Sequence, residues 1–353
     1  MRSVLPAETR GFLPLDQRRA EDVARRARAF VEMRDAYVRD WKVPEPFAYA
    51  DANWSPEARN PYLTLYRRVL ECDDEIVGQF RAFTQMFTGF NLYEMRGKAK
   101  ITQRLDDYTD EAIERVLDQN LPFVERWQAL TQGVPARCRF APPYRFGEIG
   151  HEVEGVIINH NTCAYQERIN LLWENGVVDW LDERGRTSGR LRLLEIGAGY
   201  GALAYWFQAA FPGCSYTIVD LPECLLFSGL YLSLARPDLA TRWGLDPDTP
   251  MPPFGFRFVP NYMALQLAEP FDLVINTLSM SEMSAAQVEG YCRLMKELWL
   301  CDGGIFFEQN QANPHFGSRA KETFAREFRW HRPCVSRVPA IQGEASLWAL
   351  SPL

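Results

Sequence analysis

Two stretches of the sequence place glycines and acids where apolar runs end. LRLLEIGAGYG, residues 191–201, has Glu195 near its centre and three alternating glycines after it. Further along, the apolar run SYTIVD ends in Asp220. Glycines allow a positive φ and a close approach of backbone to ligand. An acid that ends the next strand can accept hydrogen bonds from ribose hydroxyls. The pattern predicts a nucleoside-containing cofactor, either a nicotinamide or flavin dinucleotide or S-adenosylmethionine.

The glycines alone do not separate these two cofactor classes. Gly197, Gly199 and Ala202 satisfy the looser dinucleotide fingerprint G-x-G-x-x-G/A. Glu195 favours S-adenosylmethionine, because an anionic side chain is unfavourable beside a pyrophosphate and suits a ligand with an ammonium and a sulfonium. Its alternative role is at a helix N-terminus or in a salt bridge. The turn also lies past the midpoint of the chain, and only one doubly wound unit follows it. A nicotinamide-dependent oxidoreductase and a non-catalytic binding protein are the competing classes.

If the ligand is S-adenosylmethionine and its methyl group passes to a hydroxyl, the reaction would also require a proton acceptor. The reaction depends on in-line alignment, and a hydroxyl gains nucleophilicity as a base takes its proton. Glu282 in SMSEMS, His160 in INHNT and His315 after the predicted fifth strand are the candidates, ahead of His151 and His331. Each has a structural alternative: Glu282 stabilises the following helix N-terminus, His160 is hydrogen-bonded within the fold, and His315 is exposed in a loop. We favour Glu282 by a small margin. A histidine base predicts an acid limb near about pH 6–7, and an unperturbed glutamate one near about pH 4–5.

The sequence shows no metal-binding or disulfide pattern. No cluster of His, Asp and Glu has metal-ligand spacing, so no metal is predicted, although a metal requirement stays open. The eight cysteines form no C-x-x-C pair. They are expected as small buried apolar residues in a reducing compartment. MRSVLPAETRGF lacks the apolar core of a secretory signal, and no apolar run is long enough to span a bilayer. We therefore expect a cytoplasmic protein.

Alternating strands and helices would position these residues. From about residue 190, apolar runs rich in β-branched residues alternate with helical patterns. Ser284 and Gln287 form a capping box before one of the helices. The predicted fold class is α/β, a Rossmann-like doubly wound sheet with its ligand at the carboxyl ends of the strands. The predicted strands are LRLLEIG, SYTIVD, FGFRFVP, FDLVINT and GGIFFEQN, with EASLWALSPL as a final candidate.

In the N-terminal part, apolar residues recur at the spacing of helices rather than of strands. Apolar residues recur at helical spacing over 15–40, again from Pro61, and in DEAIERVLDQNLPFVERWQAL. RFGEIGHEVEGVIINHNT predicts a hairpin, and CAYQERINLLWENGVV predicts a linking helix. With 353 residues, more than one domain is expected. We predict a mainly α-helical cap domain over 1–145, a hairpin and linking helix over 146–186, and a cofactor-binding core over 187–353.

Three motifs together resemble a known family. LLEIGAGYG, YTIVDLPE and FDLVINTLSMSEMS resemble the core of class I S-adenosylmethionine-dependent methyltransferases. More narrowly, they are similar to the sugar O-methyltransferases of bacterial natural-product pathways. In that family an E-I-G-x-G-Y-G turn precedes a strand ending in V-D-x-P, and N-x-x-S-x-x-E-M follows the fourth strand. The resemblance covers roughly residues 150–310, and FFEQN has no clear counterpart.

The resemblance implies a site for S-adenosylmethionine. Tyr165 in NTCAYQ closes over the cofactor in this reading, and its alternative is packing beneath the helical domain. The other implied residues are Glu195, Gly197, Gly199 and Gly201 on the methionine side, Asp220 at the ribose, Leu221, Asn261 and Tyr262 near the adenine, and Asn276 and Thr277 near the methyl group.

The resemblance also implies an activity. It implies an S-adenosylmethionine-dependent O-methyltransferase, a transferase acting on a sugar hydroxyl of a specialised metabolite. Methylation of a carboxylate or a peptide group is the related alternative. The net charge of −7 argues against nucleic acid or an anionic membrane as the main partner. We expect a small-molecule, glycosylated acceptor, and a homodimer stays open beside a monomer.

Overall fold

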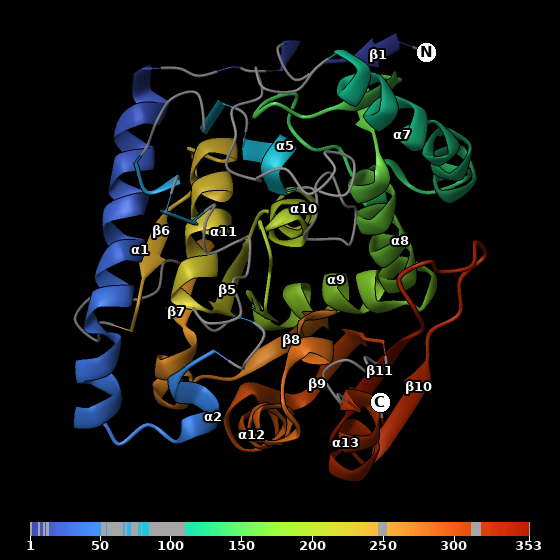
Figure 1. Cartoon of the computed structure of the whole chain (residues 1–353). Coiled ribbons are helices and arrows are strands. Elements are labelled where there is room, and N and C mark those ends of the chain that lie inside the picture. Colours follow the sequence, from blue (N-terminus) through green and yellow to red (C-terminus); the bar gives the residue numbers. More distant parts are fainter. Residues whose placement is uncertain are drawn as a thin grey trace.

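The computed structural model is shown in Figure 1. Its organising element is a sheet of eight strands that runs through the second half of the chain. The structure describes residues 2–5, 8–9, 11, 14–50, 54, 66–67, 69–71, 77–78, 80–84, 110–245, 253–311 and 319–352.

The central sheet has the strand order β10-β11-β9-β8-β4-β5-β7-β6. The pairs from β9 to β6 are parallel, and β11 is antiparallel to both of its neighbours. The four strands β4, β5, β7 and β8 are buried along nearly their whole length, as expected for a parallel sheet covered on both faces. The strands are β4 (Leu191–Ile196), β5 (Cys214–Asp220), β6 (Thr241–Trp243), β7 (Gly255–Pro260), β8 (Phe271–Thr277), β9 (Leu300–Gln309), β10 (Trp330–Pro333) and β11 (Ala345–Ala349).

This sheet confirms the predicted doubly wound α/β fold. All six predicted strands are present, as β4, β5, β7, β8, β9 and β11. The short strands β6 and β10 were not predicted, because each has only three or four residues, mostly outside the buried core, and lacks a continuous apolar run. Going outward from β4, the chain continues to β5 on one side and returns to β8 on the other. This reversal of strand order places a crevice at the carboxyl ends of β4 and β8.

Helices connect the strands and cover the sheet. The capping box predicted at Ser284 and Gln287 is present at the start of α12. The predicted linking helix is instead two helices, α8 and α9, because Gly176 between them has a φ of 76° and cannot continue a right-handed helix. The helices of this half are α8 (His160–Glu174), α9 (Val177–Ser188), α10 (Ala202–Ala210), α11 (Pro222–Ala235), α12 (Ala285–Leu294) and α13 (Ala320–Glu327).

The described N-terminal residues are mainly helical. The helix predicted over 15–40 is α1 (Pro14–Asp40), which lies alongside α11 (Figure 1). Most of the helix predicted from Pro61 lies outside the described residues. The predicted hairpin is formed by β2 (Gly150–Val153) and β3 (Val156–Ile158), and an unpredicted β1 (Arg2–Val4) pairs with β2. The other helices here are α2 (Glu45–Ala48), α5 (Phe80–Thr84) and α7 (Asp110–Thr131).

One cluster of buried apolar side chains extends from Ala20 of α1 to Trp348 of β11. The N-terminal helices and the sheet therefore share a core, and the division at residues 145 and 186 stays a prediction. Within the described part of the chain, no helix has the length and apolar character needed to cross a membrane.

Candidate functional site

A cavity opens at the carboxyl ends of β4, β5, β7 and β8. Its volume is about 980 Å³ when the space open to solvent is counted. Eight of the residues predicted from the sequence line it: Tyr165, Gly197, Gly199, Asp220, Leu221, Asn261, Thr277 and Glu282. Its wall also contains Trp54, Arg168, Ile196, Ala198, Val219, Cys224, Leu278, Ser279, Met283, Gln287 and Tyr291.

The glycine turn forms one wall of this cavity. Gly197, Gly199 and Gly201 have φ angles of 72°, 59° and 93°, so all three adopt the left-handed region that favours glycine. A Cβ on Gly197 would lie 2.2 Å from the Oγ of Ser279, so this glycine is also required by the loop after β8. Gly201 is the N-cap of α10 and lies outside the cavity wall. Gly197 and Gly199 are therefore the two glycines that face the cavity.

Asp220 joins the end of β5 to the glycine turn. Its Oδ2 accepts a hydrogen bond from the amide of Ala198 at 3.1 Å, and its Oδ1 accepts one from the amide of Leu221 at 2.8 Å. Burial raises the pKa of Asp220 to about 7, and the nearby charge of Glu282 acts in the same direction. The two backbone amides oppose this shift because they stabilise the ionised form. Asp220 thus titrates near neutral pH in the ligand-free protein.

Glu195 lies behind the cavity wall. It is buried, and its Oε2 accepts a hydrogen bond from the Tyr216 hydroxyl at 2.8 Å. Burial raises its pKa to about 8, against the stabilising effects of Tyr216 and Arg168. Glu195 does not line the cavity. Direct contact between its carboxylate and a cofactor ammonium therefore stays a prediction, and the position of Glu195 does not support it.

Arg168 is a cation that the sequence analysis did not single out. It is 2% exposed and lines the cavity from α8, three residues after Tyr165 and therefore on the same face of that helix. Its Nε donates to Gln309 Oε1 at 3.2 Å, and its guanidinium carbon lies 4.9 Å from the centre of the Tyr165 ring. A buried guanidinium at a cavity wall can pair with an anionic group of a ligand.

At the end of β7, Asn261 and Tyr262 face different surroundings. Asn261 lines the cavity, and its Nδ2 donates to the carbonyl of Phe47 at 2.9 Å. Its Oδ1 is buried and has no partner among the described residues, which leaves an acceptor available to a bound donor. The hydroxyl of Tyr262 donates to the carbonyl of Phe30 at 2.8 Å, so this side chain is directed toward α1. Only Asn261 of this predicted pair lines the cavity.

Asn276 organises the loop that follows β8. Its Nδ2 donates to the carbonyl of Ile196 at 2.7 Å and to the Oγ of Ser279, and its Oδ1 accepts from the amide of Met280 at 3.3 Å. Leu278 in this loop has φ 71° and ψ −32°, a strained conformation for a residue with a Cβ. Asn276 is fully buried and does not line the cavity, whereas the adjacent Thr277 does.

Glu282 lines the cavity from the same loop after β8. Its Oε2 accepts a hydrogen bond from the indole Nε1 of Trp54 at 2.9 Å. Burial raises the pKa of Glu282, and the Trp54 hydrogen bond lowers it by a smaller amount. Ser284 supplies the N-cap of α12, so helix capping does not depend on Glu282. Glu282 can therefore accept a proton inside the cavity.

His160 lies outside the cavity wall. It is the first residue of α8, and its ring lies edge-on to Phe123 with the ring centres 5.1 Å apart. Burial, together with the positive charges of Arg168 and Arg126, lowers its pKa to about 4. Its Nε2 is 3.4 Å from the Nε2 of Gln342. A role as general base stays a prediction, and none of these contacts directs the ring to the cavity.

His151 and His331, the other two histidines that the structure describes, belong to no cluster arranged to hold a metal ion. His315 lies outside the described residues. His151 has its Nε2 2.8 Å from the carbonyl of Leu117, and His331 stacks on Trp348 with ring centres 4.1 Å apart. Within the described ranges, no group of three or more His, Cys, Asp or Glu side chains is arranged to hold a metal ion.

Comparisons with known proteins find likenesses among solved structures, and the three described here are distant. No protein-family model matches the chain, and no curated protein matches it. Its structure is similar to that of monomeric WbdD, with 13% identity, a TM-score of 0.35, and coverage of 50% of this chain and 40% of that one. A S-adenosylmethionine-dependent methyltransferase from Clostridium acetobutylicum has 16% identity, a TM-score of 0.27, and coverage of 38% and 49%. The glycopeptide N-methyltransferase MtfA has 22% identity, a TM-score of 0.24, and coverage of 37% and 52%.

The chain therefore spans about half the length, or less, of these three solved structures. With TM-scores below 0.5, the likenesses assign no activity to it. The activity, the acceptor and any partner have to be argued from the cavity itself.

Proposed function

We propose that this protein is an S-adenosylmethionine-dependent O-methyltransferase that acts on a hydroxyl group. The observation that carries the proposal is the set of residues around the cavity: a glycine turn, an acid that ends the next strand, and one buried cation. These match the chemistry of a ligand that has two ribose hydroxyls, one carboxylate and no phosphate.

Each polar group of the cavity has a matching group on the cofactor. Asp220 would accept hydrogen bonds from the ribose hydroxyls. Arg168 would pair with the methionine carboxylate. The unpartnered Oδ1 of Asn261 would accept from the exocyclic amine of adenine. Gly197 and Gly199 leave room for close approach of the backbone to the ligand. When bound, S-adenosylmethionine supplies an electrophilic methyl group on its sulfonium.

The charges of the cavity wall favour this ligand over a nicotinamide dinucleotide. Among the described residues of the wall, Arg168 is the one cation, and it is accompanied by Asp220 and Glu282. A dinucleotide carries a pyrophosphate, which prefers a helix N-terminus free of nearby carboxylates. Here Glu195 is also buried directly behind the turn. In their ionised forms, Asp220 and Glu282 therefore favour a ligand that carries positive charge, and Glu195 adds to this only above its raised pKa of about 8.

The acceptor side of the cavity supports a hydroxyl rather than a carboxylate. Glu282 and Trp54 lie together there, and the Glu282 carboxylate can take the proton that a hydroxyl loses as its oxygen is methylated. An acceptor that carries a carboxylate would be repelled by Glu282 in its ionised form. The narrower assignment, to a sugar hydroxyl of a specialised metabolite in the cytoplasm, rests on the motif resemblance.

Calorimetry with two ligands tests the proposed cofactor. We expect S-adenosylhomocysteine to bind in the micromolar range and NADH not to bind. Binding of NADH without binding of S-adenosylhomocysteine would reverse the assignment. Transfer of a labelled methyl group to a panel of glycosylated metabolites, with aglycones and carboxylic acids as controls, then tests the acceptor class. Labelling of the carboxylic acids alone would contradict the proposed hydroxyl acceptor.

A further inference from the structure

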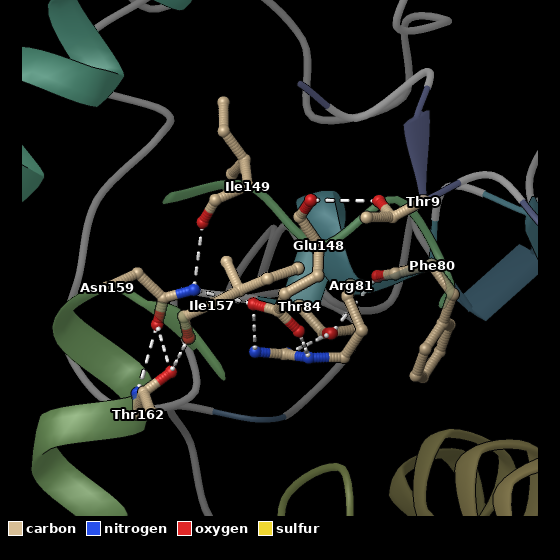
Figure 2. Close-up of polar contacts among 9 residues, drawn as sticks. All are labelled: Thr9, Phe80, Arg81, Thr84, Glu148, Ile149, Ile157, Asn159 and Thr162. Atoms are coloured by element: carbon tan, nitrogen blue, oxygen red, sulfur yellow. Dashed lines mark hydrogen bonds and ion pairs between the residues drawn. The ribbon is translucent and has the colours of Figure 1, made fainter. Parts of the chain in front are cut away.

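A fully buried ion pair joins α5 to the segment just before β2. Arg81 of α5 donates from Nε to Glu148 Oε2 at 2.8 Å and from Nη2 to Glu148 Oε1 at 3.3 Å (Figure 2). Both residues are 1% exposed. The Nη1 of Arg81 donates to Thr84 Oγ1 at 2.8 Å, so the guanidinium is held through all three of its nitrogens.

Glu148 connects this pair to the start of α8. Its Oε1 also accepts from the Nδ2 of Asn159 at 2.6 Å, as Figure 2 shows. Asn159 is the N-cap of α8, and its Oδ1 accepts from the amide of Thr162 at 2.9 Å. The helix that begins here carries Arg168, which lines the cavity. The ion pair is thus part of the framework that orients one cavity wall.

The guanidinium also lies over an aromatic ring of the glycine turn. The Cζ of Arg81 is 3.7 Å from the centre of the Tyr200 ring. Tyr200 lies between Gly199 and Gly201 and is 1% exposed. The rings of Tyr165 and Tyr231 approach it edge-on, with centres 5.5 Å and 4.9 Å away. Tyr200 is therefore enclosed on several sides, and a desolvated cation covers its face.

Stability alone does not account for such a pair. Replacing a buried ion pair with apolar residues of similar volume is often neutral or stabilising, because desolvation offsets the attraction between the charges. A desolvated cation over a ring contributes a directional attraction that apolar packing does not supply. We propose that Arg81 and Glu148 are positioning residues for the cofactor-binding turn, which they hold in its binding conformation through Tyr200. This inference rests on the proposed function, because it assigns cofactor binding to the turn.

A paired substitution tests the proposal without leaving an unpaired buried charge. In the double variant Arg81→Met with Glu148→Gln, both charges are removed, and the glutamine can still accept from Asn159. We expect the melting temperature to stay within a few degrees of wild type, while the dissociation constant of S-adenosylhomocysteine rises about tenfold. Turnover at saturating cofactor should change less than twofold, because the residues of the acceptor side are untouched. Unchanged affinity in a folded double variant would overturn the proposal.

The chain offers a matched control ion pair. Arg257 of β7 is buried and pairs with the half-buried Glu269, and neither residue lines the cavity. The corresponding variant, Arg257→Met with Glu269→Gln, should bind S-adenosylhomocysteine like wild type. A similar tenfold loss in this control would mean that any loss of a buried pair weakens binding, and it would overturn the specific role of Arg81 and Glu148.

A double-mutant cycle with Tyr200→Leu tests whether the ion pair affects cofactor affinity through the Tyr200 ring. Tyr200→Leu removes the ring, so it should weaken binding about as much as the double variant does. Combining it with the double variant should add no further loss, because contacting residues are not additive. Independent, fully additive losses would overturn the route through Tyr200.

Hydrogen exchange separates this inference from the proposed function. In the ligand-free protein, amides 197–201 should exchange faster in the double variant than in wild type, and those of the control variant should not. Failure of wild type to bind S-adenosylhomocysteine would contradict the proposed function alone. Identical exchange at these amides in wild type and the double variant would overturn the positioning role.

Discussion

The two sides of the cavity are built in different ways. The cofactor side is made mainly of residues at the ends of neighbouring parallel strands, such as Gly197 after β4 and Asp220 at the end of β5. The acceptor side is made by segments far apart in the sequence, and its hydrogen bond between Trp54 and Glu282 joins residues 228 positions apart. Backbone geometry fixes the first side, whereas the second depends on how the N-terminal residues pack against the loop after β8.

This difference separates two kinds of substitution. A change on the cofactor side should weaken binding of the cofactor, because in the proposed site backbone and carboxylate contacts hold the ligand directly. A change on the acceptor side should slow the reaction and leave cofactor affinity intact. Each experiment below tests whether one side can be altered without the other.

Gly199→Val should have the largest effect on the cofactor side. Gly199 has a φ of 59°, which a branched side chain rarely adopts, and it lines the cavity. We expect no measurable binding of S-adenosylhomocysteine by calorimetry and an intact helical signal by circular dichroism. Gly213→Val is the matched control, since a Cβ there would meet nothing within 4 Å. Normal binding by Gly199→Val would show that the turn is structural only.

Glu282→Gln should have the largest effect on the acceptor side. Removing a general base should lower turnover by about 10²–10⁴-fold, with nearly unchanged affinity for the cofactor. His160→Asn is the comparison, because His160 lies outside the cavity wall and is expected to change turnover little. If neither substitution lowers turnover tenfold, another group or water takes the proton. A rise in KM alone would instead assign Glu282 to orienting the acceptor.

The pH profile gives an independent assignment, and here the structure reverses the expectation from sequence. With unperturbed pKa values, a histidine base would give an acid limb at a higher pH than a glutamate base. Burial raises the pKa of Glu282 and lowers that of His160 to about 4. An acid limb of turnover above the ordinary glutamate range of about 4–5 therefore indicates Glu282, and a limb near pH 4 indicates His160.

Local motifs located the cavity-lining residues at the strand ends better than those that tertiary packing brings to the cavity, and the reason is physical. A strand, its glycine turn and the acid that ends the next strand are encoded within about thirty residues, because parallel strands bring their carboxyl ends together. Arg168 and Trp54 reach the cavity only through tertiary packing, so no nearby motif marks them. Glu195 and Asn276 lie in the motifs, yet they are buried behind the wall, where they hydrogen-bond Tyr216 and the loop after β8.

Arg168→Met should weaken the binding of ligands that carry the amino-acid carboxylate of the cofactor, and only of those ligands. Loss of a charged hydrogen-bond partner costs about 1.5–3 kcal/mol, so affinity for S-adenosylhomocysteine should fall by about 10- to 150-fold. Methylthioadenosine lacks the amino-acid carboxylate, so its affinity should be nearly unchanged. An equal loss for both ligands would indicate that Arg168 supports the shape of the cavity and does not pair with the carboxylate.

Asp220→Ala should weaken the binding of both ligands. Both carry the ribose, and loss of its hydrogen bonds to a carboxylate costs about 1.5–3 kcal/mol. The fold should persist, since Asp220 is the last residue of its strand and lines the cavity. Circular dichroism and calorimetry with both ligands check this outcome. Unchanged affinity would move the ribose to another part of the cavity.

The smallest expected effect is a pH dependence of cofactor affinity that arises from Asp220. Burial raises its pKa in the ligand-free protein to about 7, and ribose hydroxyls donate to the ionised form. Affinity for S-adenosylhomocysteine should therefore fall as pH decreases below 7, by at most about tenfold per unit. The stability of the ligand-free protein should change in the opposite direction. The folded-state pKa exceeds the unfolded value of about 3.9, so the contribution of Asp220 is fully present below that value and is lost as pH rises through 7.

Asp220→Asn distinguishes the titration of Asp220 from that of the nearby Glu195. The variant removes the ionisable group and keeps its shape, so its affinity, although lower, should vary little between pH 5.5 and 8. The buried Glu195, whose pKa is raised to about 8, titrates in the upper part of this range. A pH dependence that persists in Asp220→Asn would therefore assign it to Glu195, and the proton linked to cofactor binding would then lie behind the cavity wall.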